Sequence, residues 1–276
     1  WQGETFLFGS ELKALRCHPA FNATIDRNAI CLYLRHNAIP APYSIYSGIA
    51  KLSPGCLLTL SPQLPRTHNP VIQCYWSGAE VAVQGKSTLL TATPEAAVST
   101  LETLLMDAVG QQMMADVPLG AFLSGGVDSS TIVALMQAQS SRPVKTFAIG
   151  FHQDLYNEAA HAKAVAQHLG TDHTELYVTP EDSLQLIPNL AHHWDEPFAD
   201  SSQLPTLLVS KLAKQQVTVS LSGDAGDELF AGYNRYTIAA NNWHRLERIP
   251  LPLRRGAAWG ITRVSPARWN RIATAL

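Results

Sequence analysis

Residues 123–130 read LSGGVDSS, an apolar run that ends in a Ser/Gly turn and opens directly into a helical pattern. Because Gly125 and Gly126 carry no side chain, a phosphate oxygen can approach the backbone N–H groups of this turn, and the positive end of the following helix favours an anion. Asp128 lies inside the turn, where a carboxylate can hold Mg²⁺ on a bound pyrophosphate. The alternative is an ordinary strand-to-helix turn with Ser129 as N-cap, but the complete string favours a phosphate-binding loop.

Strands and helices alternate on both sides of this loop. Short apolar or β-branched runs, typical of strands, occupy residues 119–123, 144–149, 175–178 and 217–221. Helical spacing of apolar residues occupies residues 94–113, 129–139 and 158–169. This alternation predicts an α/β fold, a doubly wound parallel sheet with helices on both faces.

A second glycine-containing loop, SGDAGDE at residues 222–228, follows the last of these runs. Its carboxylates, Asp224, Asp227 and Glu228, would repel one another without a cation or a proton, so we expect a metal-binding or acid–base role. Ligands bind at the carboxyl edge of a doubly wound sheet. The sequence therefore predicts that this loop faces residues 123–130.

The SGGxDSS string and residues 217–233 together resemble the ATP-pyrophosphatase (PP-loop) enzymes, and ADVPLG at residues 115–120 resembles glutamine-dependent asparagine synthetases. The resemblance covers nearly all of residues 1–236 and implies an adenine nucleotide hydrolase-like fold. It also implies a carbon–nitrogen ligase: an aspartate carboxylate attacks the α-phosphorus of MgATP, pyrophosphate leaves, and ammonia displaces AMP from β-aspartyl-AMP to give asparagine. ATP and Mg²⁺ are the implied cofactors, and the implied partners are small molecules.

The same resemblance assigns roles to single positions. Asp224 matches an acidic position important for forming the acyl-adenylate, so it is the predicted catalytic residue. Asp128 and Asp227 match carboxylates that hold Mg²⁺, and Leu123 and Ile149 match positions that line the adenine pocket. The other predicted contacts to ATP or pyrophosphate are Ser124, Gly125, Gly126, Asp128, Ser129, Ser130, Ser222 and Gly223.

Two departures from the bacterial synthetases leave the acceptor carboxylate open. Asp224 stands where those enzymes carry the longer Glu, and Ser201 falls about where an Arg near the aspartate pocket is expected. DEPFADSS at residues 195–202 resembles amidotransferases of polysaccharide and peptide gene clusters, or is a solvated acidic turn. The alternatives are a PP-loop enzyme that adenylates another carboxylate, β-lactam synthetase-like or peptide-amidating, and an inactive fragment that serves as a nucleotide-binding or interaction module.

The front of the chain resembles the end of the family's glutaminase domain, a partial α+β N-terminal-nucleophile fold. The resemblance rests on FGSELKAL at residues 8–15, LSPG at residues 52–55 and the closing Tyr75-Trp76. The nucleophilic Cys and the glutamine-binding residues of that domain have no match in the sequence. The four cysteines, which we interpret as small core or surface residues, are Cys17, Cys31, Cys56 and Cys74.

Together these resemblances predict three regions. Residues 1–76 form the C-terminal part of a glutamine amidotransferase domain, residues 77–93 form a linker or long crossing loop, and residues 94–276 form a PP-loop synthetase domain that continues in family members beyond the end of this chain. The resemblance leaves the oligomeric state open, with a homodimer of the complete enzyme as one option.

Composition narrows the partners and the compartment. The formal charge is −2, but residues 241–276 carry seven Arg and one Glu, interleaved with apolar residues, which predicts charged faces of packed helices and no nucleic-acid partner. No apolar run is long enough to span a bilayer, and four cysteines without a CxxC pair fit a reducing cytoplasm.

Two further patterns are rejected. GKST at residues 85–88 resembles the end of a Walker A loop, but Glu80 occupies the place of its first Gly, so the segment is interpreted as linker. The histidines lack the spacing of a zinc site; they include His161, His168, His173, His192 and His193.

Overall fold

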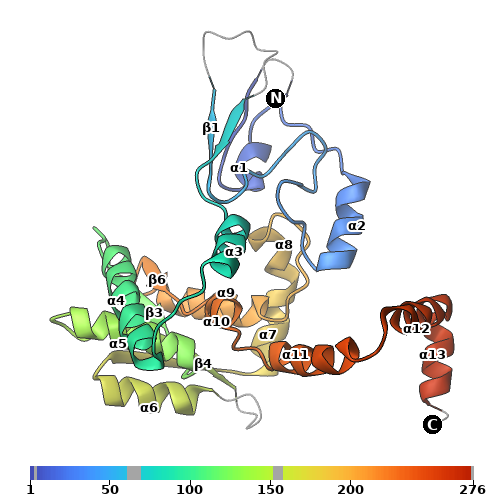
Figure 1. The fold of residues 1–276 in the computed structure, drawn as a ribbon. Helices are drawn as coiled ribbons and strands as arrows, with labels where there is room; N and C mark the ends of the chain where they lie inside the picture. Colours follow the sequence, from blue (N-terminus) through green and yellow to red (C-terminus); the bar gives the residue numbers. More distant parts are fainter. Residues whose placement is uncertain (3–4, 61–69, 152–157, 275–276) are drawn as a thin grey trace.

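The computed structural model describes residues 1–2, 5–60, 70–151 and 158–274. Figure 1 shows a blue front segment above a green-to-orange body of strands and helices, from which orange-red helices extend to one side. Within these described ranges, no helix combines the length and the apolar character needed to cross a membrane.

The described strands of the body form a four-stranded parallel sheet. In chain order they are β3 (Leu119–Phe122), β4 (Lys145–Phe151), β5 (Asp172–Val178) and β6 (Val219–Leu221). In space the order is β5-β4-β3-β6, and each pairing is parallel. The chain builds outward from β3 to β5 and then returns to the other side of β3, so the switch point of the sheet lies between the carboxyl ends of β3 and β6.

Helices cover both faces of this sheet. One face carries α4 (Pro94–Gln112), α5 (Val127–Gln139) and α6 (Ala159–Leu169), and the other carries α9 (Gln203–Ala213). Neighbouring residues of β4 show the division, because Ala148 packs in the core beneath α5 and α6, whereas Phe147 packs with Leu212 and Val217. The predicted doubly wound α/β fold is confirmed.

Two helix ends match their sequence signals. Thr93 caps α4, its Oγ1 accepting from the N–H of Ala96 at 3.3 Å, and Pro94 occupies the first helical position. α6 ends at Gly170, whose φ of 70° is left-handed. Between β5 and β6 the chain adds α7 (Pro180–Leu186), the 3-10 turn η2 (Ile187–Asn189) and α8 (Leu190–His193), and after β6 it adds α10 (Gly226–Phe230).

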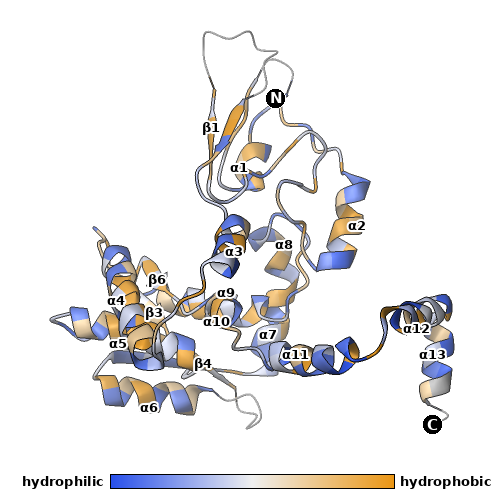
Figure 2. Ribbon diagram, in the orientation of Figure 1, coloured by the Kyte–Doolittle hydropathy of each residue, from blue (hydrophilic) through white to orange (hydrophobic). Residues whose placement is uncertain are grey.

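The basic C-terminal region forms three consecutive helices in the described part of the chain: α11 (Asn234–Glu247), α12 (Leu251–Arg263) and α13 (Pro266–Ala273). Hydrophilic and hydrophobic residues are interspersed along α11 and α12 (Figure 2), yet no residue of either is buried. The expectation of packed helices is therefore wrong for α11 and α12. Local contacts replace packing, since the Arg263 guanidinium lies 4.2 Å from the centroid of the Trp259 ring.

The front segment has its own small core. It contains α1 (Leu12–Arg16), α2 (Arg27–His36) and the antiparallel pair β1 (Cys56–Thr59) and β2 (Val71–Cys74). The buried residues of this core are Ala29, Ile39, Ile45 and Tyr46.

The loop expected at residues 77–93 is largely a helix, α3 (Gly78–Ser87). Ser77 caps it, its Oγ accepting from the N–H of Glu80 at 3.4 Å. No residue of α3 is buried, and a helix without a buried face does not need the apolar stripe by which helices are recognised in a sequence. Its helix propensity comes from Ala, Glu and Gln.

Candidate functional site

The predicted phosphate loop, residues 123–130, lies at the carboxyl end of β3 and runs into α5. α5 begins at Val127, two positions before the predicted start, and its N-cap Gly126 makes no side-chain capping bond. Uncapped N–H groups at a helix start are suited to an anion. Since Ser129 lies inside the first turn, the alternative that Ser129 is the N-cap is wrong.

Serine hydroxyl groups organise this loop. The Oγ atoms of Ser124 and Ser129 lie 2.9 Å apart, and the N–H of Ser124 donates to Ser129 Oγ at 3.2 Å. The N–H of Gly126 donates to Ser124 Oγ at 3.3 Å. Ser130 Oγ is buried and has no hydrogen-bond partner among the described residues, and Ser130 lines a groove between α5 and α6, so its predicted contact to ATP or pyrophosphate stays a prediction.

Gly125 is required by both conformation and space. Its φ of 82° is left-handed, and a Cβ there would lie 2.6 Å from the N atom of Ala162 in α6. Gly126, by contrast, has only Ser124 Oγ within 4 Å of the place of its missing Cβ, at 3.4 Å. The loop is therefore packed against α6 at one glycine and open at the next.

The second loop, residues 222–228, touches the start of α5 through two glycines. A Cβ on Gly223 would lie 2.6 Å from the N atom of Ser129 and 2.7 Å from the carbonyl carbon of Asp128, and a Cβ on Gly226 would overlap the Asp128 carboxylate. Backbone therefore meets backbone at the switch point of the sheet. The prediction that the two loops face each other is confirmed.

The three carboxylates of the second loop point to different partners. Asp224 is exposed and accepts from Ser222 Oγ at 3.0 Å, whereas Glu228 accepts from Tyr233 Oη at 2.8 Å. The Asp227 carboxylate lies against Gly232. The hydrogen bond to Glu228 raises the pKa of Tyr233. These contacts disperse the like charges that the sequence suggested would be crowded together.

The donor chemistry of the site fits Mg²⁺. Within the described ranges no group of three His, Cys, Asp or Glu side chains is arranged to hold a metal ion. Mg²⁺ in nucleotide sites, however, commonly takes one or two carboxylates and completes its shell with phosphate oxygens and water. The Asp128 carboxylate lies against Gly226 of the second loop and could supply one such oxygen ligand, but its metal role stays a prediction. The metal role of Asp227 also stays a prediction.

Leu123 and Ile149 lie on opposite faces of the sheet. Leu123 is 1% exposed and packs in the core with α5 and α6, and Ile149 in β4 has the same orientation as Phe147, toward α9. The two side chains therefore do not face each other, and the predicted contacts of these residues to adenine stay a prediction.

Space for a ligand group adjoins Ser222. A cavity of about 370 Å³ lies between α4, α5 and β6, and Ser222 lines it at the second loop. Its other walls include Leu105, Asp107, Val109, Ile132 and Leu221.

Residues 195 and 196 have a role that the sequence did not indicate. Asp195 accepts from the N–H of Lys13 at 3.1 Å and forms an ion pair with the Lys13 ammonium at 3.0 Å. Burial acts to raise the pKa of Asp195, but these contacts to Lys13 outweigh burial and hold the pKa below its ordinary value. The Lys13 pKa is raised, first by Glu11 and then by Asp195.

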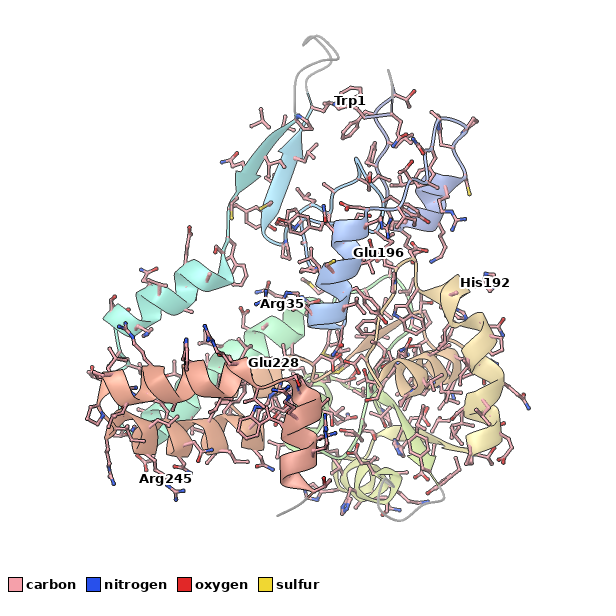
Figure 3. The ribbon with its side chains drawn as sticks, turned by 90° about the vertical axis from the view of Figure 1, so that its right-hand side faces the viewer. Trp1, Arg35, His192, Glu196, Glu228 and Arg245 are labelled. Atoms are coloured by element: carbon pink, nitrogen blue, oxygen red, sulfur yellow. The ribbon has the colours of Figure 1, made fainter. Side chains whose placement is uncertain are left out.

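Glu196 makes a matching contact. Its carboxylate accepts from the N–H of Ile45 at 2.7 Å and pairs with Lys51. Figure 3 shows Glu196 where the blue front segment meets the body, and a cavity of about 750 Å³ lies at this junction. The side chains of Asp195 and Glu196 are 16% and 14% exposed, so the interpretation as a solvated turn is wrong for these two residues.

Two protein families match this chain, one over its front segment and one over most of the rest. The Asparagine synthase family matches residues 100–274, and the Glutamine amidotransferase domain family matches residues 1–76. Asparagine synthetase [glutamine-hydrolyzing] 1 of Bacillus subtilis is 34% identical over 249 residues, which are 90% of this chain and 37% of that protein. A protein of Methanocaldococcus jannaschii, provisionally named a glutamine-hydrolysing asparagine synthetase, is 37% identical over 239 residues, 84% of this chain and 44% of its own length.

The chain thus spans less than half the length of these two relatives. Among solved structures, an NMN synthetase from Francisella tularensis has 14% identity and a TM-score of 0.36 over 49% of this chain and 58% of its own, a likeness too remote to bear on function. The family match over residues 100–274 and the two loops that meet at the switch point of the sheet agree, and the chain belongs to the asparagine synthase family.

Proposed function

We propose that this chain is the ATP-using part of an amide-forming ligase that adenylates a carboxylate, with aspartate as the first candidate substrate. The observation that carries the proposal is the contact between the two loops, in which Gly223 lies against the backbone of Asp128 and Ser129. A nucleotide bound along that contact would have its phosphates at the start of α5 and its reacting centre beside the second loop.

The proposed reaction has two steps. The substrate carboxylate attacks the α-phosphorus of ATP, pyrophosphate leaves, and an acyl-adenylate is formed. Ammonia then attacks the acyl carbon and AMP leaves, which gives the amide. The N–H groups of the loop at residues 123–130, with the hydroxyls of Ser124, Ser129 and Ser130, bind the charge that grows on pyrophosphate, and proper alignment of the reactants supplies much of the acceleration.

Three carboxylates have proposed roles. Asp224 acts on the adenylation step from the exposed tip of the second loop, and Ser222 Oγ holds its carboxylate by a hydrogen bond. Asp128 and Asp227 would hold Mg²⁺, which when bound neutralises charge on the pyrophosphate oxygens. Leu123 and Ile149 would contact adenine through their backbones.

We also infer the division of labour along the chain. Residues 1–76 belong to a glutamine amidotransferase part, residues 77–93 connect it to the rest, and residues 94–276 belong to the synthetase part. Small molecules are the proposed substrates, the proposed compartment is the cytoplasm, and a homodimer of the complete enzyme is one option. In the longer relatives, glutamine hydrolysis supplies the ammonia; for this chain alone we expect added ammonium to do so.

ATP–pyrophosphate exchange tests the proposal. Exchange that depends on aspartate supports the asparagine-forming reaction, exchange with another member of a carboxylate panel supports a different acceptor, and exchange with neither supports a nucleotide-binding fragment. Asp128→Asn should abolish exchange, because it removes a proposed Mg²⁺ ligand. The circular dichroism spectrum should stay unchanged, because Asp128 lies at the surface of the site and the substitution removes no core volume. Parental exchange in this variant would exclude the phosphate-loop assignment.

A further inference from the structure

Cys56 and Cys74 lie directly opposite each other in the β1–β2 hairpin. In the same register Gly55 is opposite Tyr75, and the N–H of Tyr75 donates to the Gly55 carbonyl at 2.9 Å. Because hydrogen-bonded and non-hydrogen-bonded pairs alternate in an antiparallel ladder, the two cysteines form a non-hydrogen-bonded pair. The Cα atoms of such pairs are about 4.5 Å apart, at the short end of the range of about 4.4–6.8 Å found in disulfides.

The two thiols also interact. Opposite residues of a ladder present their side chains on the same face. Burial, and after it a hydrogen bond with the Cys74 thiol, raises the pKa of the Cys56 thiol. Cys74 is the more exposed of the two, and its Sγ donates to the carbonyl of Trp76 at 3.2 Å. An oxidant in solution can therefore reach Cys74 first.

We propose that Cys56 and Cys74 are a thiol-oxidation site, at which they form a reversible cross-strand disulfide with a low-molecular-weight disulfide such as oxidised glutathione as oxidant. Cys74 loses its proton and attacks one sulfur of the oxidant, whose S–S bond breaks and releases one thiol that takes up that proton. Cys56 then attacks Cys74 Sγ, and the second thiol leaves with the proton of Cys56. Two cysteine thiols are oxidised, and one disulfide is reduced to two thiols.

A disulfide between Cys56 and Cys74 would hold together the β1–β2 hairpin, from which the chain continues into α3. Every residue of β2 is exposed, and a two-stranded hairpin is marginally stable by itself. β2 ends at Cys74, and α3 begins four residues later, so the disulfide fixes the strand from which the chain leaves the front segment. Oxidation also removes the S–H donor to Trp76.

Equilibration of the full chain in glutathione redox buffers tests this site. After acid quenching and alkylation, mass spectrometry should find the Cys56 and Cys74 peptides joined with the loss of two hydrogens. With reduced glutathione held at or below about 0.1 mM, the joined form should exceed glutathione adducts at these two positions about tenfold or more, since the second thiol acts at an effective concentration in the millimolar range. Cys17 and Cys31 are internal controls, expected to appear as free thiols or glutathione adducts.

Variants distinguish a disulfide between Cys56 and Cys74 from separate reactions of each thiol with glutathione. Cys74→Ser should leave Cys56 unjoined and remove any difference in melting temperature between the oxidised and reduced chain, whereas the matched control Cys31→Ser should keep both the bond and that difference. Glutathione adducts at Cys56 and Cys74 without a joined peptide in the parent chain would overturn the proposal. The mass spectrum of the parent is decisive even if Cys74→Ser folds poorly, and it does not depend on ATP chemistry.

Discussion

Among single side chains, Asp224 distinguishes a chemical role from a structural one. Asn in its place keeps an oxygen that can accept from Ser222 Oγ but loses the charge, so we expect Asp224→Asn to fold normally and to lose about a hundredfold to a thousandfold in ATP–pyrophosphate exchange. Asp224→Glu should retain part of the exchange, because it keeps the charge and displaces it by roughly an angstrom. Initial exchange rates measure both, with circular dichroism as the folding control. Full activity in the Asn variant would reduce Asp224 to a turn residue.

Gly223 tests the contact between the two loops. A Cβ would lie 2.6 Å from the N atom of Ser129, which is backbone and cannot rotate away, so Gly223→Ala should separate the loops and lower exchange by about a hundredfold or more. Gly85→Ala in α3 is the matched control, since nothing lies within 4 Å of the place of its Cβ. The free energy of unfolding of this control should equal that of the parent or exceed it by up to about 1 kcal/mol, because Ala has the higher helix propensity. Unchanged exchange in Gly223→Ala would argue that the loops do not act together.

Within individual strands, we expect His173 in β5 to make the stability of the sheet depend on pH. Burial, as the largest effect, lowers its pKa from 6.5; Glu175 acts to raise the pKa and Lys163 to lower it, and Nδ1 is 2.8 Å from Thr146 Oγ1. Below pH 6.5 the unfolded chain therefore binds a proton at this side chain more readily than the folded chain. The stability contributed by neutral His173 is full above pH 6.5 and falls as the pH drops through the folded pKa.

Urea unfolding between pH 7.5 and pH 5.5 measures this dependence. We expect the free energy of unfolding to fall with pH in the parent, and to fall less in His173→Asn, whose amide can still pair with Thr146. His168→Gln serves as the control, because His168 is exposed at the end of α6, and its pH dependence should match that of the parent. Equal slopes in all three proteins would remove His173 as the titrating group.

The elements that the sequence predicted well are those whose signals are local. The strand-to-helix turn at residues 123–130 could be predicted because a strand, two glycines and a helix start follow one another within residues 119–130, and β6 could be predicted because β-branched residues precede the second loop. α3 was missed because a fully exposed helix has no apolar stripe. The roles of Asp195 and Glu196 could not be predicted, since their partners Lys13 and Lys51 lie far away in sequence and only folding brings them together.

Across the whole chain, Glu196 joins the front segment to the body. Glu196→Ala removes the acceptor of the Ile45 N–H and the partner of Lys51, at an expected cost of about 1.5–3 kcal/mol. Hydrogen exchange should rise in residues 39–51 before it rises in β3 and β4. Glu11→Ala is the control; this side chain is 59% exposed in its pair with Lys13, so its loss should cost less than about 1 kcal/mol. Unaltered hydrogen exchange in residues 39–51 of the Glu196→Ala variant would show that the junction does not depend on Glu196.

The strand order β5-β4-β3-β6 also has a consequence during synthesis on the ribosome. β3 and the start of α5 leave the exit tunnel well before β6, because Gly223 follows Ser129 by about 94 residues. At translation rates of about 5–20 residues per second, the nascent chain exists for about 5–20 s with β3 unpaired on the side that β6 later covers. During that interval the chain has the loop at residues 123–130 but not the backbone that closes against it, so a ribosome stalled before residue 217 would display a sheet in which the proposed ligand site is still incomplete.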